Sequence, residues 1–350
     1  MKGLALHIIS IIIMSKAILL GHGSGGKMSH NLITDLFVKY FSNPVLQKQT
    51  DSALLKIDNQ DIAFTTDSYV VDPVFFPGGN IGDLAICGTV NDLAVSGAKP
   101  LYISASFIIE EGFKLDELEE IVNSMTERAR EANVLIVTGD TKVVNKGKCD
   151  KIFITTSGIG KLNKNYVPIS TGKNIKIGDQ LIINGTIADH GMAIMGAREG
   201  INLISDIQSD SAPLNHLIQE VLSNSNSVKF MRDVTRGGLA TVLSEITKGK
   251  FFGIDIQEEK IPLNENVNGM CELLGFDPMF VANEGKVLII VNKEDSNKIL
   301  NIIRNNKYGK QAEIIGDVVS EHTGKSILKT QIGGSRIIDM LAGEQLPRIC

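Results

Sequence analysis

The residue with the clearest chemical potential is the last one, Cys350, which ends the segment 344–350. A thiolate is the reactive form of cysteine, and it reacts only where other molecules can reach it. Chain ends are usually mobile unless contacts hold them, so a terminal thiol can move where a core thiol cannot. The competing interpretation is a frayed end that finishes in cysteine by chance. Cys350 therefore indicates a function only if other residues of the chain can act on its thiol.

A second candidate is the glycine-rich segment 21–27, which reads GHGSGGK and precedes a helix-like stretch at 28–41. Glycines allow backbone N–H groups to face an anion closely, and Lys27 adds a mobile positive charge. The segment lacks the GxxxxGK[ST] spacing of a P-loop. Alone, such a loop is more often a flexible approach to a helix, so it predicts an anion site only in company with other ligands.

Aspartates follow apolar, strand-like runs at several places. They are Asp67, Asp72, Asp92, Asp140 and Asp233. Hard oxygen ligands of this kind suit Mg²⁺, which proteins commonly hold with one or two carboxylates and nucleotide phosphates. Any one of them is more often a turn former or a helix cap, and Asp233 most of all, because a helix is expected to begin near Gly237. As a group they favour a metal–nucleotide site.

Lys142 and Glu284 form a third candidate, from opposite halves of the chain. A glutamate in a turn is by default a solvated loop residue. A buried glutamate near a lysine would instead be a proton-transfer pair, and spacing does not decide between the two. His22 and His30 could ligate a metal, but histidines beside a glycine loop are more often surface groups or phosphate contacts.

These groups are positioned by a chain of 350 residues, long enough for two domains of about 150 residues each. Hydrophobic residues make up 43% of it, which suffices for both cores. A net charge of −5 and the lack of Trp argue against nucleic-acid binding. The four cysteines show no CxxC spacing, which disfavours a disulfide framework or a zinc site and favours the cytoplasm.

Strand-like and helix-like patterns alternate along the chain, which predicts an α/β fold in two domains. Strands are expected at 62–66, 101–109, 134–137, 152–159, 180–184, 253–256, 286–291 and 312–319. Helices are expected at 115–129, 213–222, 237–247 and 296–305. The polar stretch 161–176 is the expected linker.

The first residues resemble a membrane segment, because 4–20 is largely apolar. His7, Ser10 and Lys16 interrupt the run, which is short for a span, and no cleavage site follows it. We therefore predict no membrane association. Met14 offers a natural start, so residues 1–13 are predicted to be an extension outside the fold.

Longer motifs connect these candidates. They read HGSGGK at 22–27, TDSYVVDP at 66–73, FFPGG at 75–79, CGTVNDLAVSG at 87–97, DVTRGGL at 233–239, NEG at 283–285 and PRIC at 347–350. Over nearly all of residues 15–350 they resemble the HypE family, the carbamoyl dehydratases of [NiFe]-hydrogenase maturation, within the aminoimidazole ribonucleotide synthetase-like superfamily. The long central run and the terminal cysteine are specific to that family, whereas the glycine loop alone is not.

The resemblance implies a two-domain α/β fold of the aminoimidazole ribonucleotide synthetase type. An N-terminal ATP-binding domain at 14–165 would dimerise through its sheet. A C-terminal α/β domain at 166–335 and a mobile tail at 336–350 carrying Cys350 would follow. ATP and Mg²⁺ would lie in a groove between the domains, near the interface of a homodimer.

Site residues are implied where this chain matches the motifs of the family. The metal ligands would be Asp67, Asp92 and Asp140. Nucleotide contacts would also come from Gly23, Ser24, Gly25, Gly26, Lys27, Asn91 and Asp233. Cys350 would be the modified cysteine, with Lys142 and Glu284 beside it. The α-carboxylate of Cys350 is expected to raise the pKa of its thiol, and Arg348 to oppose this.

The resemblance also implies a reaction. A HypF-like carbamoyltransferase would load a carbamoyl group onto Cys350. ATP would phosphorylate the carbonyl oxygen, and loss of a nitrogen proton and of phosphate would leave a thiocyanate, with Glu284 and Lys142 managing the proton. The tail would then swing outward and hand cyanide to iron on a HypC–HypD-like complex.

Two other functions fit parts of the sequence. A selenophosphate synthetase-like enzyme would carry a reactive cysteine or selenocysteine in the glycine loop, where this chain has Ser24 and no thiol. A non-catalytic nucleotide-binding scaffold, or a metal-delivery module using His22, His30 and Cys350, would assemble the maturation machinery without dehydration. Loss of water from a carbamoylated terminal peptide on addition of ATP distinguishes the dehydratase from these alternatives.

Overall fold

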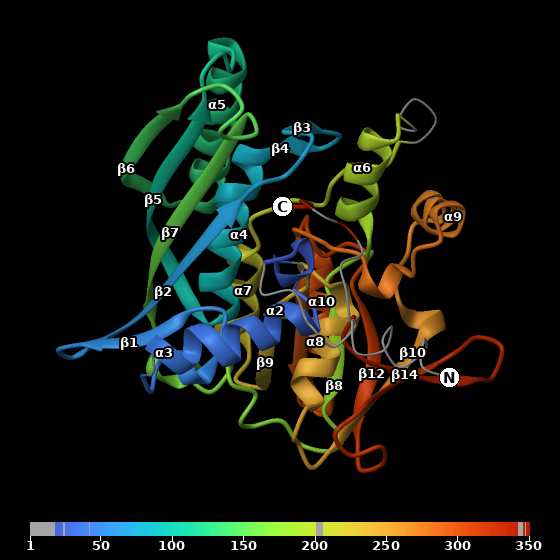
Figure 1. Ribbon diagram of the computed structural model, residues 1–350. Coiled ribbons are helices and arrows are strands. Elements are labelled where there is room, and N and C mark those ends of the chain that lie inside the picture. Colours follow the sequence, from blue (N-terminus) through green and yellow to red (C-terminus); the bar gives the residue numbers. More distant parts are fainter. Residues whose placement is uncertain (1–17, 24, 42, 201–205, 342–345, 347) are drawn as a thin grey trace, which may run out of the picture.

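The computed structural model describes residues 18–23, 25–41, 43–200, 206–341, 346 and 348–350. In this part of the chain, two α/β units each surround their own sheet and pack side by side (Figure 1). The predicted α/β fold class is confirmed. The predictions for residues 1–13 and for Ser24 lie outside the described residues. Among the helices described, none combines the length and the apolar character needed to cross a membrane.

The N-terminal sheet has five strands in the order β1-β2-β7-β5-β6. β5 and β6 run parallel, and the other neighbours are antiparallel. Side chains alternate between its faces, as strand geometry requires: on β2, Ala63 and Thr65 are buried whereas Phe64 is exposed. The strands are β1 (Ala53–Ile57), β2 (Gln60–Tyr69), β5 (Ala98–Glu110), β6 (Leu135–Val144) and β7 (Ile152–Leu162).

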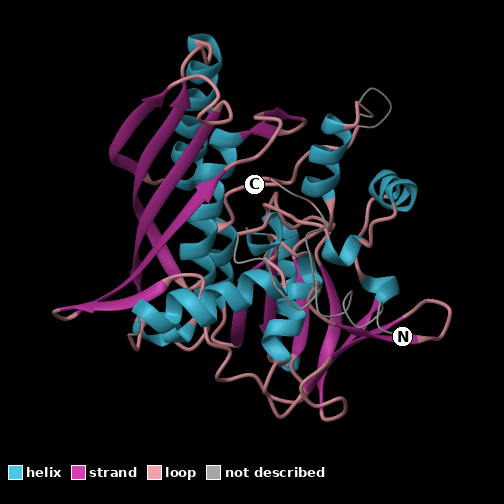
Figure 2. Cartoon of the chain, in the orientation of Figure 1, coloured by secondary structure: helices cyan, strands magenta, loops and turns pink. Residues whose placement is uncertain are grey.

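Helix α4 (Ile81–Val95) covers the inner face of this sheet. It begins at a capping box, in which the Asn80 side chain accepts from the N–H of Gly82 and Asp83 accepts from the N–H of Asn80. Its other side contacts the second unit, and Figure 2 shows helices between the two sheets. Every residue of α4 except Asp92 is therefore buried.

Two further helical segments flank the N-terminal sheet. Helix α5 (Leu115–Ala132) lies beside α4 and confirms the helix predicted at 115–129, with Ile121 and Met125 buried one turn apart. The segment predicted at 28–41 is also helical. It consists of α2 (Lys27–Leu32), a π-helical stretch (Ile33–Val38) and α3 (Lys39–Phe41).

The C-terminal unit holds a seven-stranded sheet in the order β14-β13-β10-β12-β8-β11-β9. Its strands are β8 (Gln180–Ile183), β9 (Val228–Asp233), β10 (Gly253–Gln257), β11 (Val287–Val291), β12 (Glu313–Val319), β13 (Ser326–Lys329) and β14 (Ser335–Ile338). Its helices are α6 (Asp189–Arg198), α7 (Asn215–Asn224), α8 (Gly238–Thr247), α9 (Glu265–Leu274) and α10 (Lys293–Asn305). A hairpin of β3 (Phe75–Phe76) and β4 (Gly79–Asn80) belongs to the N-terminal unit.

The end of the chain returns to the junction between the units. Because β14 is part of the C-terminal sheet, the tail beyond it starts after Ile338, slightly later than the predicted boundary at 336. Figure 1 shows the C-terminus between α4 and α6. Ile349 is 3% exposed and packs into the core under the N-terminal sheet. The tail is thus docked, in a conformation that sequence alone left open.

Candidate active site

Four aspartates from both units gather at the junction beside the end of α4. They are Asp51 before β1, Asp67 on the inner face of β2, Asp92 in the last turn of α4 and Asp233 at the end of β9. Thr65 donates a 2.7 Å hydrogen bond to the Asp92 carboxylate. Arg232 lies 3.1 Å from Asp51. Among the described residues, the other three carboxyl groups form no ion pair, although the charge of Arg236 acts on Asp67 and that of Arg232 on Asp233.

These carboxyl groups crowd one another. Burial raises the pKa of Asp92 well above its usual range, and the charges of Asp67, Asp233 and Asp51 add to the effect. Burial also raises the pKa of Asp67, and burial with the charge of Asp51 raises the pKa of Asp233 to about 8. A divalent cation would relieve this repulsion, and an all-oxygen donor set fits Mg²⁺ better than a soft metal.

The third predicted metal ligand, Asp140, does not join this group within one chain. Pairing across the sheet aligns Asp67 with Thr156, then with Ala105, then with Gly139. Asp140 therefore lies three strand spacings from Asp67, roughly 14 Å at about 4.8 Å per strand. Within the described part of the chain, no three His, Cys, Asp or Glu side chains are arranged to hold a metal ion.

Asp140 also faces the opposite side of the sheet. It aligns with Ser106, then with Thr155, then with Ser68, whose side chain is exposed on the outer face. Lys142, two residues along β6, shares that outer face and lies 2.5 Å from Asp140. Neither residue meets Glu284 or Cys350 in a single copy, so their predicted roles require another chain.

Glu284 is not a solvated loop residue. It lies in the turn before β11 and is 4% exposed. Asn283 fixes this turn, because its side chain accepts from the N–H of Ala188 at 2.7 Å and donates to the carbonyl of Val234 at 2.9 Å. The Glu284 atom Oε1 is buried and has no hydrogen-bond partner among the residues that the structure describes. Burial, followed by the charge of Asp210, raises the pKa of Glu284 well above its usual range.

A buried ion pair supports the Glu284 turn from behind. Asp210 accepts hydrogen bonds from the backbone N–H groups of Glu284 (3.0 Å) and Gly285 (3.2 Å) and pairs with Lys286 at 2.8 Å. A Cβ on Gly285 would lie 1.9 Å from the carbonyl oxygen of Asp210, so only glycine permits this approach. Lys286 also lies 3.9 Å from Asp189.

The terminal residues run beside the segment that follows β2. The N–H of Val70 donates to the α-carboxylate of Cys350 at 3.0 Å, and the N–H of Asp72 donates to the carbonyl of Arg348 at 3.2 Å. The Arg348 side chain donates to the carbonyl of Val70 at 2.9 Å and pairs with Asp150. This pairing carries the Cys350 side chain to the junction that holds Glu284 and Asp67.

The surroundings of the Cys350 thiol differ in part from expectation. Its pKa is raised, as predicted, to about 12. Burial is the main cause, with Glu284 and Asp67 adding to it, while Arg236 opposes it. The prediction that Arg348 opposes the rise in this pKa is wrong, because its guanidinium pairs with Asp150 and donates to the carbonyl of Val70 instead.

Arg236 connects the glycine loop to this thiol. Its guanidinium donates a 2.8 Å hydrogen bond to the carbonyl of Gly23. Gly25 has φ +78°, and a Cβ there would lie 2.9 Å from the Cβ of Arg236, so the loop needs glycine to pack against this residue. The negative charge of an ionised Cys350 is the main cause that raises the pKa of Arg236, and the charge of Asp67 adds to it. Burial acts in the opposite direction. Arg236 is thus the cation that faces the reactive end of the chain.

Lys27 and Gly26 also lie at this junction. Gly26 is the N-cap residue of α2, and the N–H of Lys27 donates to the carbonyl of Leu341 at 3.0 Å. The start of the tail is therefore tied to the glycine loop. The Lys27 side chain itself is exposed and available to an anion.

Two other candidates have structural partners, and a third lacks the helix-capping role that the sequence allowed. The amide of Asn91 donates to the carbonyl of Ala212 at 3.0 Å and accepts from the N–H of Leu214 at 2.8 Å, so it already holds a loop in place. Asp72 forms an exposed pair with Lys151 at 2.8 Å. The proposed capping role of Asp233 is wrong, because the N-cap of α8 is Gly237 and has no side-chain hydrogen bond.

The two candidate histidines lie apart from one another. His22 hydrogen bonds to the backbone of Leu19, and His30 lies 3.3 Å from Lys248. A histidine beside a lysine ammonium is a poor cation ligand, because the ammonium repels the metal.

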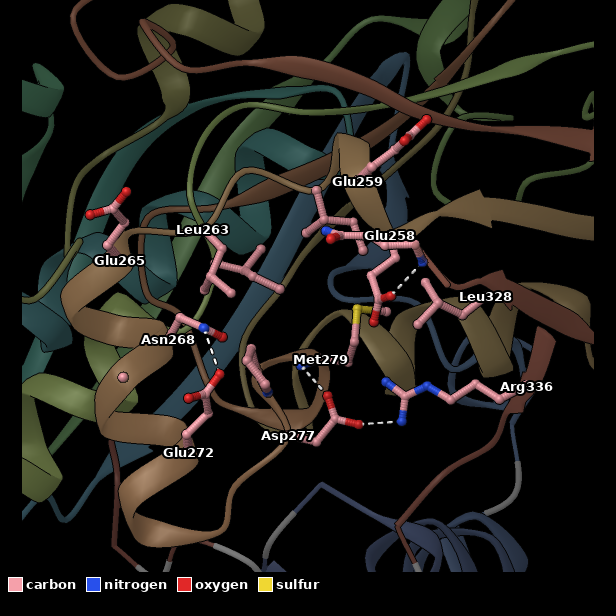
Figure 3. A pocket seen from close by; sticks show the side chains of 15 residues that line it. Glu258, Glu259, Leu263, Glu265, Asn268, Glu272, Asp277, Met279, Leu328 and Arg336 are labelled. Atoms are coloured by element: carbon pink, nitrogen blue, oxygen red, sulfur yellow. Dashed lines mark hydrogen bonds and ion pairs between the residues drawn. The ribbon is translucent and has the colours of Figure 1, made fainter. Parts of the chain in front are cut away.

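A cavity of about 710 Å³ lies in the C-terminal unit and contains none of the predicted site residues. Figure 3 shows five carboxylates around it, with Arg336 pairing with Asp277. They are Glu258, Glu259, Glu265, Glu272 and Asp277. The hollow is thus distinct from the junction where Cys350, Arg236 and Glu284 gather.

Comparison with known families follows the two units. Residues 49–162 match the family described as AIR synthase related protein, N-terminal domain. Residues 176–329 match the family described as AIR synthase related protein, C-terminal domain. The chain is therefore an AIR synthase-related protein, as the fold and the position of its site between two α/β units suggest.

Closer relatives define the branch of this superfamily. A carbamoyl dehydratase HypE from Rhodobacter capsulatus is 46% identical over 334 residues, covering 95% of this chain and 97% of the relative. A solved HypE in a HypE–HypF complex is 49% identical with a TM-score of 0.83, covering 89% of this chain and 99% of that one. A HypE solved with ATP is 44% identical with a TM-score of 0.79, covering 95% and 100%.

This chain belongs to the HypE family of carbamoyl dehydratases. That membership confirms the resemblance drawn from the motifs and favours a dehydratase over a selenophosphate synthetase or a metal-delivery module. Several site residues carried no signal that set them apart in the sequence. They are Asp51, Asp210, Arg236 and Lys286. Arg236 lies inside the DVTRGGL motif, which was the one clue available.

Proposed function

We propose that this chain removes the elements of water from an S-carbamoyl group on its own Cys350, in an ATP-dependent reaction that leaves a thiocyanate. The observation that carries the proposal is the docked tail, which brings the terminal thiol to Arg236, Glu284 and Asp67. A carrier cysteine at the end of a chain has this use only if it reaches a site that can act on it.

Each side chain at the junction has a defined task in this scheme. Bound Mg-ATP supplies the phosphoryl group that turns the carbamoyl oxygen into a leaving group. Asp67 and Asp92 would each offer a carboxylate to Mg²⁺, whose other ligands would be nucleotide phosphates, with Asp51 and Asp233 nearby, and the glycine loop with Lys27 would contact phosphate. Arg236 neutralises negative charge on the oxygen as it is phosphorylated and leaves.

Glu284 is the proton acceptor in the proposal. Conversion of the carbamoyl nitrogen to a nitrile nitrogen releases both N–H protons, while the C–O bond breaks and phosphate departs. A carboxylate that lies beside the sulfur and whose pKa is raised is a stronger base than an ordinary glutamate, so it can accept a proton from the nitrogen. Its unpartnered oxygen Oε1 is free to accept that hydrogen bond.

A second copy of the chain would complete the site. The outer face of the N-terminal sheet presents a continuous apolar row across four strands, formed by Phe64, Ile159, Tyr102 and Leu135. These side chains are 40%, 40%, 46% and 64% exposed, which is unusual for a row of large apolar groups. A homodimer through this face would cover the row and bring Asp140 and Lys142, which share it, to a partner site.

Partners follow from the relatives. A solved HypE forms a complex with HypF, so we propose a HypF-like carbamoyltransferase as the donor that loads Cys350. A HypC–HypD-like iron-carrying complex would accept the cyanide, because the thiocyanate carbon must leave to a metal. Cys87, Cys149, Cys271 and Cys350 are all free thiols, which is consistent with the cytoplasm as the site of action.

Mass spectrometry of the terminal peptide tests the proposal. The full chain is carbamoylated by its HypF-like donor, and Mg-ATP is then added. The peptide should lose the mass of one water, and Cys350→Ser should never gain the carbamoyl group. If the carbamoylated peptide keeps its mass while ATP binds normally, the chain is a scaffold and not a dehydratase.

A further inference from the structure

The docked tail is held mainly through its backbone. The main-chain oxygens of its last three residues all accept hydrogen bonds: the carbonyl of Arg348 from the N–H of Asp72 and from the Arg198 side chain, that of Ile349 from His190, and the α-carboxylate of Cys350 from the N–H of Val70. None of these contacts involves the sulfur. The grip is therefore the same whether the sulfur is a thiol, a carbamoyl thioester or a thiocyanate.

His190 is the side chain buried deepest in this grip. It is fully buried at the start of α6, and its atom Nε2 lies 2.8 Å from the carbonyl oxygen of Ile349. The ring meets Phe76 edge-on with centroids 5.5 Å apart, which fixes its orientation. A buried histidine with one nitrogen on the tail backbone is a specific contact and not a packing accident.

The hydrogen bonds around His190 define its tautomer. A carbonyl oxygen only accepts, so Nε2 carries the hydrogen. The atom Nδ1 lies 2.8 Å from Oγ of Ser209, and that hydroxyl already accepts from the N–H of Ser211 at 3.1 Å. The Ser209 hydroxyl can still donate its hydrogen to Nδ1 of a neutral ring. Burial lowers the pKa of His190, which favours this neutral form, and in either form Nε2 donates to the tail.

The loop that orients His190 also positions Glu284. Ser209 is followed by Asp210, whose carboxylate accepts from the N–H groups of Glu284 and Gly285. The N–H of Ser209 donates to the carbonyl of Pro77 in the N-terminal unit at 2.8 Å. The residue that orients His190 and the residue that holds the Glu284 turn are thus neighbours in one loop.

We propose that His190 is a positioning residue, which together with Arg198 and Ser209 forms a tail clasp that holds Cys350 beside Glu284. The clasp is closed when the tail is docked, and it opens each time Cys350 leaves to meet a partner. It acts on the main chain of Ile349 and Arg348 and does not touch the reacting atoms. The inference builds on the proposed function, but docking can be measured without turnover.

Alkylation of Cys350 by iodoacetamide in the full chain without nucleotide measures opening of the clasp. The synthetic peptide 344–350 supplies the rate for a fully released thiol. We expect His190→Leu to raise the Cys350 rate about five- to tenfold, because one net hydrogen bond is lost. His190→Gln, whose amide can donate to Ile349 and accept from Ser209, should stay within about twofold of wild type.

Each outcome decides the proposal. If folded His190→Leu is alkylated at the wild-type rate, or if folded His190→Gln is as fast as His190→Leu, the donor has no role and the proposal fails. Should His190→Leu not fold, Arg198→Met replaces it, since it removes the donor to Arg348 from a half-buried position and should give the same rise. An unchanged rate in that variant also overturns the proposal.

Single-turnover dehydration of the carbamoylated chain adds a second readout. An open clasp should slow dehydration in proportion to the loss of docking, while the Mg-ATP concentration for half-maximal rate stays unchanged. A wild-type protein that docks its tail but never dehydrates would refute the proposed function and leave the clasp standing. The two ideas are therefore separable.

Discussion

The backbone N–H of Glu284 donates a 3.0 Å hydrogen bond to the carboxylate of Asp210, while the Glu284 atom Oε1 has no partner in the described part of the chain. The proposed proton acceptor is thus held by its backbone, and its carboxyl group faces the Cys350 sulfur. Burial alone would raise the pKa of Asp210, but Lys286 holds it below its usual range. Asp210 is therefore ionised, and its carboxylate supports the turn that carries Glu284.

Asp210→Asn tests how much the buried ion pair between Asp210 and Lys286 stabilises the fold. The substitution leaves the Lys286 ammonium buried with only Asp189 at 3.9 Å to neutralise it. Breaking a buried pair in this way should lower the free energy of unfolding by about 3 kcal/mol. Urea denaturation measures the change, and Asp206→Asn, on the exposed part of the same loop, should change it by less than about 0.5 kcal/mol. If both variants change the free energy of unfolding equally, the ion pair between Asp210 and Lys286 does not stabilise the fold.

Glu284→Gln should spare carbamoyl loading and block dehydration, because the amide cannot accept the nitrogen proton. It should also lower the pKa of the Cys350 thiol, since the carboxylate that raises it is removed. Mass spectrometry follows the first effect, and the pH dependence of Cys350 alkylation follows the second. A wild-type dehydration rate would remove Glu284 from the chemistry. A lowered thiol pKa alongside that rate would leave it as a neighbour only.

Asp92→Asn should weaken Mg-ATP binding, because one carboxylate of the crowded group is lost. The same change relieves repulsion among Asp67, Asp92 and Asp233, so the nucleotide-free variant should melt at or above the wild-type temperature. Calorimetric titration with a magnesium complex of a non-hydrolysable ATP analogue checks the first effect. Asp116→Asn, on the exposed start of α5, is the matched control. A lower melting temperature with intact binding would make Asp92 a purely structural residue.

Helix α5, which has one buried face, was predictable from the sequence, and helix α4, which is buried on all sides, was not. Helix α5 was found because Ile121 and Met125 recur at helical spacing opposite charged residues. Helix α4 has no such pattern, since both the sheet and the second unit cover it. The motif around Asp92 was therefore recognised before the helix that carries it.

Site residues could be predicted where a sequence motif marked them. Their contacts with residues from distant parts of the chain could not. Asp67 and Asp92 were assigned together, and the fold does bring them together. Asp140 was assigned with them, but sequence does not reveal strand order, and two strands, β7 and β5, lie between β2 and β6. His190 and Asp210 lie in stretches that look like an ordinary helix start and a polar loop, so no local signal indicated a contact with the tail.

The apolar row on the outer sheet face predicts the oligomeric state. Ile159→Glu places a charge in the middle of that row and should convert a dimer to a monomer, as measured by light scattering. Because Asp140 and Lys142 would then be missing from the site, dehydration should be lost as well. Val122→Glu makes the same change on α5, where the side chain is 44% exposed, and should leave the dimer intact. A dimeric, active Ile159→Glu would place the interface elsewhere.

Tail docking should weaken at alkaline pH. Burial holds the pKa of the docked Cys350 thiol at about 12, with Glu284 and Asp67 adding to the rise and Arg236 opposing it. A released thiol has a pKa of about 8.5. The docked state therefore binds the proton more tightly, so docking is undiminished below pH about 8.5 and falls by about tenfold per pH unit above it, until the docked thiol itself ionises.

Hydrogen exchange at the Val70 and Asp72 amides reports this loss, because both donate to main-chain oxygens of the tail. After correction for intrinsic exchange, their protection should fall between pH 8.5 and 10 in the wild type. Cys350→Ser keeps the tail backbone and has no group that titrates in this range, so its protection should stay constant. If the serine variant loses protection in parallel, ionisation of the thiol is not what releases the tail, and the low-dielectric environment assigned to Cys350 is wrong.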